Sequence, residues 1–294
     1  MTNSEPTSRD EKRNHARAQA AAFREHAQKR KRRNRLLIQV GVVVVVLAVA
    51  GVIIGVVTTN NHSAAAITAK STASVDGPKN MGSDGILMTG KDGKITAVRT
   101  PAVKAKGTPV ATDESKMTST ANIVEFIDYQ CPYCNEFETT NLDQIDKWVA
   151  AGKATVEIHP LAFLDASSQG TRYSSRAENA AACVANFDPD AFLTVTKALY
   201  ANQPPESSPG LPNSKLVSIL AGAGAGSASI AGCVNGESFK SWVSASTALT
   251  ISSVFSGNVS TPTVFVNGAQ YTGSLTDASV FAAFVDKQKP GTTN

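Results

Sequence analysis

The chain has 294 residues and a formal net charge of +4, with 42% hydrophobic and 18% charged residues. The positive charge belongs to the first 35 residues, which hold 11 Lys and Arg against four acidic residues; the other 259 carry 17 basic and 20 acidic groups. A basic head could bind nucleic acid, but attraction to anionic lipid beside a membrane span explains it with fewer assumptions. We therefore expect no nucleic-acid partner.

An uninterrupted apolar segment runs from Leu36 to Val57. Its 22 residues carry no charge and one polar side chain, Gln39. A helix of this length, rising ~1.5 Å per residue, spans ~33 Å, enough for the ~30 Å hydrocarbon core of a bilayer. A basic cluster, Lys29–Arg33 with Arg35, precedes it and nothing comparable follows it. The positive-inside rule thus predicts a single-pass protein of the cell membrane, with residues 1–35 cytoplasmic and the rest extracytoplasmic.

A cleaved signal peptide is the alternative reading of this segment, because three alanines at positions 64–66 offer a cleavage site. The basic region is long, however, and the apolar stretch exceeds the 7–15 residues that are usual for a signal core. Both properties favour an uncleaved signal-anchor, a transmembrane helix over residues 36–57.

Residues 58–121 have the composition of a tether. Residues 58–83 are rich in Thr, Ser, Ala and Asn, which favours a flexible linker, and residues 101–120 form a second loose stretch. Between them, apolar runs at 85–88 and 94–98 flank Lys91-Asp92-Gly93 and predict a short hairpin. A compact domain then covers residues 122–289, about 168 residues, which is ample for one hydrophobic core. Residues 290–294 form a tail.

Within residues 122–289 the pattern predicts strand, helix, strand, helical block, strand, strand and helix. The strands are 123–128, 154–158, 261–266 and 269–272, and the first helix follows the Cys pair to residue 151. Residues 168–253 have much Ala and little strand character, and Asp188-Pro189 is typical of a helix start with Asp as N-cap. Asn267-Gly268 predicts a hairpin turn. Asp277 should cap a last amphipathic helix whose apolar face carries Val280, Phe281, Phe284 and Val285.

The strongest chemical signal is Cys131-Pro132-Tyr133-Cys134, placed where the first strand meets a helix. A helix N-terminus carries partial positive charge and free N–H groups, which stabilise a thiolate on the first cysteine. The second cysteine lies about one turn further, close enough to attack a mixed disulfide made by the first. The motif predicts thiol–disulfide exchange, with Cys131 as an exposed nucleophile and Cys134 as the buried resolving thiol. A purely structural bond is the alternative, but so small a ring constrains the unfolded chain little.

The other two cysteines, Cys183 and Cys233, stand 50 residues apart and also follow the predicted membrane span. In an exported domain, paired cysteines indicate disulfides. Four cysteines allow three pairings, and Cys131–Cys134 with Cys183–Cys233 is the one consistent with the local motif. Two buried free thiols at 183 and 233 are the alternative. A zinc site would need a second close pair, so we expect no metal.

These landmarks, in this order, resemble the thioredoxin superfamily, specifically its DsbA-like branch, over about residues 122–289. The Cys-Pro-Tyr-Cys motif matches the active-site dithiol, Thr261-Pro262 matches the cis-proline that faces it, and Glu125 stands where the superfamily keeps a buried acid. Residues 168–253 match the helical insertion of DsbA-like proteins. Residues 160–165 and 202–206 also resemble membrane-anchored members from Gram-positive and actinobacterial lineages. The predicted fold class is α/β, a thioredoxin fold with a helical insertion, preceded by one transmembrane helix.

The resemblance also implies roles for individual residues. Glu125 would exchange protons with Cys134 through water; an ordinary solvent-facing strand residue is the alternative. Pro262 would keep metal away from the dithiol, and Thr261 would present its backbone to an extended substrate peptide; a trans proline in a turn is the alternative. The resemblance departs at Tyr133, where the enterobacterial enzyme has His, and this leaves the redox potential open.

The implied activity is that of a protein thiol–disulfide oxidoreductase that introduces disulfides into exported proteins with free cysteines, without an organic cofactor. A membrane reoxidant, DsbB-like or vitamin K epoxide reductase-like (VKOR-like), is the expected partner. A reductase or isomerase of the same fold stays open. A non-catalytic binding or chaperone domain is the rival of another class, and the intact Cys pair and Thr-Pro argue against it. No Lys, Arg or His lies within ten residues of Cys131, so the helix end and polar groups must lower its pKa, to ~4–6.

Overall fold

A computed structural model describes residues 69–113, 117 and 121–289. The predicted cytoplasmic head and the predicted transmembrane helix over residues 36–57 lie outside these residues, as does the tail. Of the helices in the described part of the chain, none combines the length and the apolar character that a bilayer crossing requires.

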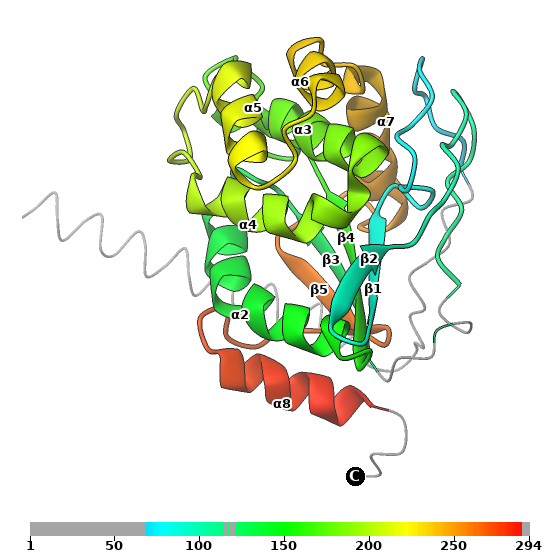
Figure 1. Ribbon diagram of the computed structural model, residues 1–294, viewed down its shortest axis with the longest axis vertical. Coiled ribbons are helices and arrows are strands. Elements are labelled where there is room, and N and C mark those ends of the chain that lie inside the picture. The colour runs from blue at the N-terminus through cyan, green and yellow to red at the C-terminus, as the bar shows by residue number, and fades with distance from the viewer. Residues whose placement is uncertain (1–68, 114–116, 118–120, 290–294) are drawn as a thin grey trace, which may run out of the picture. The chain divides into compact units, whose positions relative to one another are not determined.

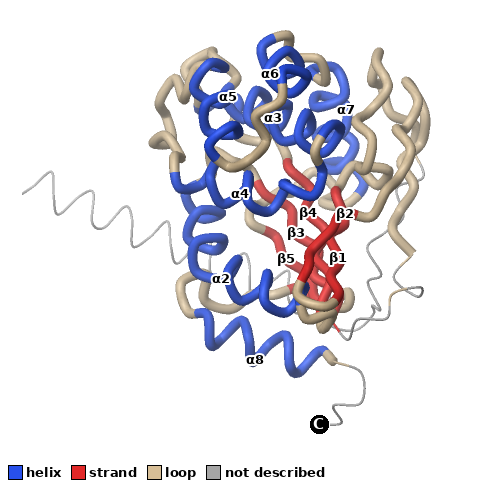
Figure 2. The backbone as a smooth tube through the Cα atoms, in the orientation of Figure 1, coloured by secondary structure: helices blue, strands red, loops and turns tan. Residues whose placement is uncertain are grey.

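A six-stranded mixed sheet forms the centre of the described unit, with the strand order β2-β1-β4-β3-β5-β6. β3 and β4 are parallel, and the other neighbours are antiparallel. Figure 2 shows these strands as the red layer between the helices. The strands are β1 (Ile86–Lys91), β2 (Lys94–Ala97), β3 (Ala121–Ile127), β4 (Ala154–Pro160), β5 (Thr263–Val266) and β6 (Ala269–Gln270).

Helices cover this sheet and extend beyond one end of it (Figure 1). α2 (Pro132–Ala150) packs against the sheet, with α8 (Ala278–Gln288) beside it. The remaining helices form the block predicted between the second and third strands of the domain, so the helical insertion is confirmed. They are η2 (Asp165–Ser167), α3 (Tyr173–Phe187), η3 (Pro189–Ala191), α4 (Phe192–Ala201), α5 (Asn213–Gly222), α6 (Ala228–Asn235) and α7 (Lys240–Ser253).

β3 separates two apolar layers, because successive side chains of a strand point to opposite faces. Ile123 and Ile127 belong to the main core, together with Phe137 of α2. Val124 and Phe126 point the other way, into a smaller cluster. Glu125 shares the face of Ile123 and Ile127, and it is fully buried. The alternation of the strand therefore directs a carboxyl into the main core on the side of α2.

The folded unit begins well before the boundary near Asn122 that composition predicts. Ala73 and Met81 are core residues, and two stretches run side by side through hydrogen bonds from Gly77 N to Val103 O and Asn80 N to Thr100 O, 2.8 and 2.9 Å. A Cβ at Gly77 would lie 3.0 Å from the Trp242 ring of α7. Small residues thus bring this backbone close to a large aromatic side chain. Their low hydrophobicity gives the segment the composition of a tether.

The hairpin predicted within that segment is present, as β1 and β2, joined by Asp92-Gly93 with positive φ at both residues. Asn267-Gly268 makes the same kind of turn between β5 and β6. Asp277 caps α8 by accepting hydrogen bonds from the N–H groups of Ser279 and Val280. These three local predictions are confirmed, since each rests on backbone chemistry that acts within four residues.

Two local predictions differ from the structure. Asp188 does precede a helical turn, η3, but its side chain makes no cap hydrogen bond. The carboxylate of Asp190 instead accepts hydrogen bonds from Ala97 N at 2.8 Å and from the Arg99 guanidinium at 2.8 Å. These bonds connect η3 to the end of the hairpin. In α8, Val280 is 40% exposed, whereas Phe281 and Val285 are buried. The apolar face of α8 is therefore narrower than predicted.

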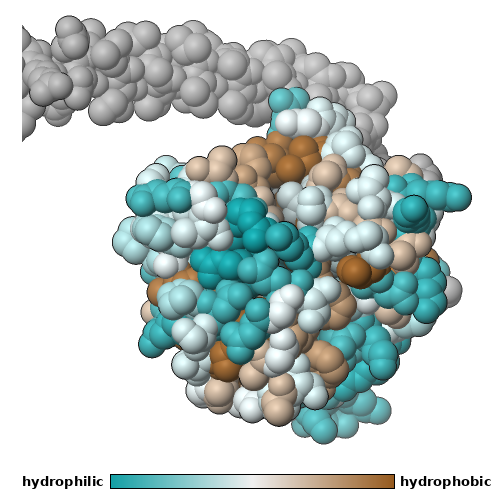
Figure 3. Space-filling model, turned by 90° about the horizontal axis from the view of Figure 1, so that it is seen from above, coloured by the Kyte–Doolittle hydropathy of each residue, from teal (hydrophilic) through white to brown (hydrophobic). Residues whose placement is uncertain are grey.

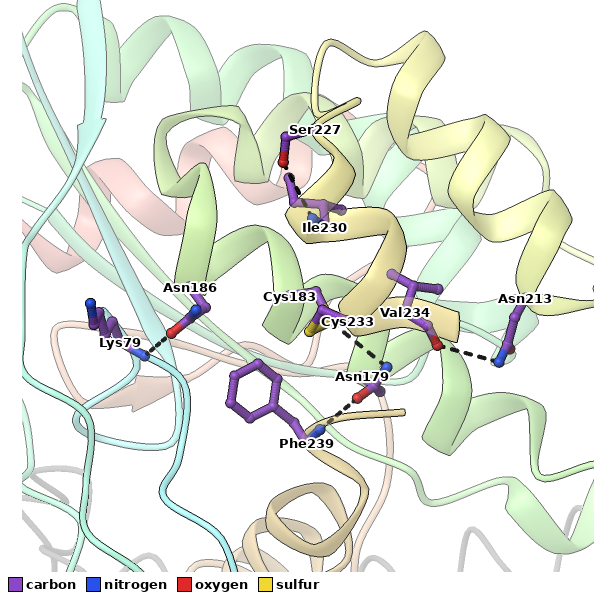
Figure 4. The surroundings of a disulfide bond; sticks show 10 residues. All are labelled: Lys79, Asn179, Cys183, Asn186, Asn213, Ser227, Ile230, Cys233, Val234 and Phe239. Atoms are coloured by element: carbon purple, nitrogen blue, oxygen red, sulfur yellow. Dashed lines mark hydrogen bonds between the residues drawn. A yellow bond between two sulfur atoms is a disulfide. The ribbon is translucent and has the colours of Figure 1, made fainter. Parts of the chain in front are cut away.

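The disulfide between Cys183 of α3 and Cys233 of α6 confirms the predicted pairing. Asn179, one turn before Cys183, donates to its sulfur at 3.8 Å and accepts from Phe239 N at 2.9 Å. Figure 4 shows Asn179 between the disulfide and Phe239. Because Phe239 leads into α7, the bond and the amide together connect three helices of the insertion.

On the face seen from above Figure 1, the hydrophobic residues of the described part of the chain are scattered. In Figure 3, which views the molecule from above Figure 1, hydrophobic residues form several separate patches among hydrophilic ones. Phe187, 50% exposed, is among the large hydrophobic side chains that remain accessible at the end of α3.

Candidate active site

The two cysteines of the motif lie at the junction of β3 and α2, as predicted. Cys131 is the N-cap residue of α2, with Pro132 at the first helical position, where the missing N–H is no loss. Cys134 is on the first turn, and both thiols are free. The expectation of an exposed Cys131 is wrong: the residue is only 4% exposed, whereas its neighbour Tyr133 is 60% exposed. The sulfur is covered because it turns towards the loop before β5.

That loop contains the predicted cis-proline. The Thr261-Pro262 bond is cis, and the Cys131 thiol donates to the Thr261 carbonyl at 3.3 Å. The pairing of β5 with β3 explains why Thr261 lies beside Cys131. β5 runs antiparallel to β3, with Phe126 opposite Thr263, so residues just before β5 and just after β3 share one edge of the sheet. Both predictions for Pro262, its isomer and its position beside the dithiol, are confirmed.

The surroundings of Cys131 favour a thiolate. Its pKa is lowered to about 6, first because the Cys134 thiol donates a hydrogen bond to its sulfur; burial opposes this, and the Thr261 side chain assists. The N–H groups of Cys134 and Tyr133, at the start of α2, lower it further. The helix end and nearby polar groups thus lower the pKa as predicted, and the partner thiol makes the largest contribution.

Cys134 has the opposite environment. It is fully buried, and burial is the main reason that its pKa lies well above the ordinary value. The nearby Cys131 sulfur raises it further, while the N–H of Asp128, 3.5 Å from Cys134 Sγ, opposes the increase. The two thiols are therefore different: Cys131 loses its proton readily, and Cys134 keeps its own. This asymmetry is what an attacking and a resolving thiol require.

Glu125 is buried, as the resemblance implied, and it faces a second buried carboxyl. Glu138 lies one turn after Cys134 on α2, and each of the two carboxyls affects the pKa of the other. The carboxyl oxygens of both residues are buried without a hydrogen-bond partner. Burial raises the pKa of Glu125 to about 8; the neighbouring Glu138 carboxyl opposes the increase, and the charge of Asp146 adds to it. Burial and the Glu125 carboxyl hold the pKa of Glu138 well above its usual range. The pair therefore retains a proton near neutral pH, on the face of α2 that carries Cys134.

Asp128 is a candidate site residue for which the sequence predicted no chemical role. It is fully buried, and its carboxylate accepts from Gln130 N, Leu164 N and the Ser174 hydroxyl, each at 2.8 Å. Burial raises its pKa to about 7; these hydrogen bonds oppose the increase, and the charge of Cys131 adds to it. Asp128 thus joins the backbone before Cys131 to the helical insertion.

Sequence spacing held usable signals for these residues. Glu138 is four positions after Cys134, which places both on one helix face. Asp128 ends a buried apolar run three residues before Cys131, and Cys131 N donates to the Asp128 carbonyl at 3.0 Å in the tight turn between strand and helix.

In the described part of the chain, no group of three His, Cys, Asp or Glu side chains is arranged to hold a metal ion.

Comparison with known proteins agrees with this geometry. A family model described as Thioredoxin matches residues 98–287, and no curated protein matches the chain. Reduced DsbA from Mycobacterium tuberculosis has 26% identity and a TM-score of 0.54, covering 71% of this chain and 93% of that protein. Reduced DsbG, a disulfide bond oxidoreductase from the same organism, has 30% identity and a TM-score of 0.51, covering 63% and 85%.

A third solved structure shares the fold at lower identity. MdbA from Corynebacterium diphtheriae is a thiol-disulfide oxidoreductase with 18% identity to this chain and a TM-score of 0.52. The match covers 78% of this chain and 100% of MdbA.

Proposed function

We propose, from the premise that this chain belongs to the thioredoxin family and is a DsbA-like thiol–disulfide oxidoreductase, that it introduces disulfides into exported proteins through Cys131 and Cys134. The observation that carries the proposal is the asymmetry of the two thiols. Cys131 has a pKa of about 6, beside the cis bond at Pro262, and Cys134 is a buried thiol with a pKa well above the ordinary value.

The proposed reaction begins with oxidised enzyme and a substrate that has two free cysteines. A substrate thiolate attacks the Cys131 sulfur, the bond to Cys134 breaks, and its electron pair leaves on the Cys134 sulfur, which takes up a proton. The second substrate thiolate then attacks the substrate sulfur of the mixed disulfide, and Cys131 departs as a thiolate. The substrate loses two electrons and the enzyme dithiol gains them.

The buried carboxyls suit the proton step. Cys134 leaves as a thiolate in an apolar site, so it needs a proton from nearby. The Glu125–Glu138 pair keeps one near neutral pH, because burial raises the pKa of both groups. We assign the proton transfer to Glu125, through water, as the sequence-based reading expected. Thr261, whose carbonyl lies 3.3 Å from Cys131 Sγ, is positioned to bind the substrate backbone.

The direction of exchange follows from the stability of the Cys131 thiolate. A thiolate that is stabilised at pH 7 favours the reduced enzyme, and this makes its disulfide an oxidant. Turnover then requires a reoxidant, for which a DsbB-like or VKOR-like membrane protein is the proposed partner. The charge asymmetry around residues 36–57 supports an anchored protein whose catalytic domain is extracytoplasmic.

Oxidation of a reduced, unfolded substrate tests this function. The oxidised protein should form disulfides in a cysteine-containing model substrate stoichiometrically, and Cys131→Ser should abolish this. The double variant Cys183→Ala/Cys233→Ala, which removes only the structural bond, is the matched control and should retain the chemistry in its folded fraction. Equal loss of activity in the control, without loss of folded protein, would contradict the assignment.

A further inference from the structure

The side chain of Gln203 lies against the backbone of the proposed nucleophile. Its amide nitrogen donates to the Cys131 carbonyl at 2.9 Å and to the Tyr129 carbonyl at 3.1 Å. Gln203 follows the end of α4, where its own N–H donates to Tyr200 O at 3.1 Å. A residue more than 70 positions along the chain therefore bonds the carbonyls on both sides of Gln130, directly before the helix that carries the dithiol.

Asn135 orients this amide. Its side-chain nitrogen donates to Gln203 Oε1 at 3.0 Å and to Tyr200 O at 3.1 Å, and its backbone N–H donates to the Cys131 carbonyl at 3.2 Å. A closed ring results: Cys131 accepts from Gln203 and Asn135, and Gln203 accepts from Asn135. Because a carbonyl has two lone pairs, Cys131 O can accept both bonds at once. Each donor and acceptor of the Gln203 side chain has a partner.

This ring fixes the part of Cys131 that determines where its sulfur points. Cys131 has the extended backbone of an N-cap residue, with φ −72° and ψ 119°, and no side-chain hydrogen bond of the capping type holds it there. In this orientation the N–H groups of Tyr133 and Cys134 interact with its sulfur and lower its pKa. Without the Gln203 amide, the carbonyls of Tyr129 and Cys131 would each lose a donor. The side chains of Tyr129 and Gln130 would still bond the insertion, but the Cys131 carbonyl would lose its side-chain donor from it.

We propose that Gln203, oriented by Asn135, is a positioning residue that holds the Cys131 backbone in the geometry that thiol–disulfide exchange requires. The proposal rests on the assignment of Cys131 as the attacking thiol. It gives the helical insertion a part in the reaction, since the loop after α4 sets the reactivity of a cysteine on α2.

Gln203→Met tests the proposal, because methionine has a similar length and no donor. In the full-length reduced protein, titration of thiolate absorbance should show the Cys131 pKa raised by about one unit, from about 6. The equilibrium constant with glutathione at pH 7 should then favour the reduced enzyme about fivefold less, since a smaller fraction of the thiol is ionised.

Gln169→Met is the matched control. Gln169 also donates to this loop, to Ser207 O at 2.7 Å, but it does not touch the Cys131 backbone. It should leave the Cys131 pKa and the glutathione equilibrium unchanged. Asn135→Leu is a second test that does not depend on how well Gln203→Met folds, and it should move the Cys131 pKa in the same direction by a smaller amount.

A merely structural role predicts a different result: a lower melting temperature with the wild-type pKa and glutathione equilibrium in the folded protein. That outcome for Gln203→Met, or an equal pKa shift in Gln169→Met, would overturn the proposal. Failure of the proposed function looks different, since the wild-type protein would then not exchange disulfides with a reduced substrate at all.

Discussion

Replacing Glu125 by Gln should change how the stability of the protein depends on pH. Glu125 is fully buried, and burial raises its pKa from 4.5 to about 8. An acid whose pKa is raised by folding stabilises the fold fully below its unfolded pKa, and this stability is lost as the pH rises through the folded value. Glutamine keeps the size of the side chain and removes the ionisation, so the variant should lack this loss.

The magnitude follows from the two pKa values. Between pH 4.5 and pH 7 the unfolded chain releases a proton that the folded protein keeps, at about 1.36 kcal/mol per pH unit. Wild-type protein should therefore lose about 3 kcal/mol of unfolding free energy over this interval relative to Glu125→Gln. Burial and the Glu125 carboxyl also hold the pKa of Glu138 well above its usual range.

Urea denaturation of the reduced protein at several pH values between 5 and 8 measures this difference. Glu136→Gln, a change at an exposed carboxyl two positions from Glu138 on the same helix, is the control and should follow the wild-type curve. Parallel curves for wild type and Glu125→Gln would refute the reasoning, since the carboxyl would then be ionised without cost in the folded state.

Three further outcomes are expected. Oxidation of the dithiol should lower the pKa of Asp128, because the Cys131 charge contributes to its increase; carboxyl NMR titration of both redox states measures this, and an unchanged value counts against the contact. Removing the Cys183–Cys233 bond should cost about 4 kcal/mol, from a loop of about 50 residues in the chain-entropy model, as denaturant midpoints will show. Protease added to spheroplasts should digest residues 69–289, whereas a protected catalytic domain would contradict the predicted topology.

The sequence predicted those parts of the fold that depend on nearby residues. The Asn267-Gly268 turn, the Asp277 cap and the helix opening at the Cys pair each rest on interactions within a few positions. The Cys183–Cys233 pairing was also predictable, because the chain has four cysteines and two of them form the Cys-x-x-Cys motif. The cis bond at Pro262 came from the family resemblance, and no spacing rule would have given it.

Other features depend on contacts between distant segments, which composition does not reveal. The composition around Gly77 is typical of a linker, but in the structure this glycine packs against Trp242. The motif predicts an exposed Cys131, but the loop that contains Thr261 covers it. The side chain of Gln203 has no hydrogen-bond partner nearby in the sequence, since its amide nitrogen donates to residues 72 and 74 positions away. The fold and the two cysteines of the site were thus predictable from motifs, whereas the residues that tune them required the tertiary structure.

The pKa of Cys131 is the measurement that tests the central claim most directly. Ultraviolet absorbance of the reduced protein, titrated from pH 3 to pH 10 beside Cys131→Ser, isolates its thiolate. The structure predicts a transition at about 6 that the variant lacks, with no second transition near the ordinary cysteine value, because Cys134 titrates well above it. A single transition at about 8.5, the value of a free thiol, would contradict the assignment of Cys131 as a stabilised thiolate and of the protein as an oxidant.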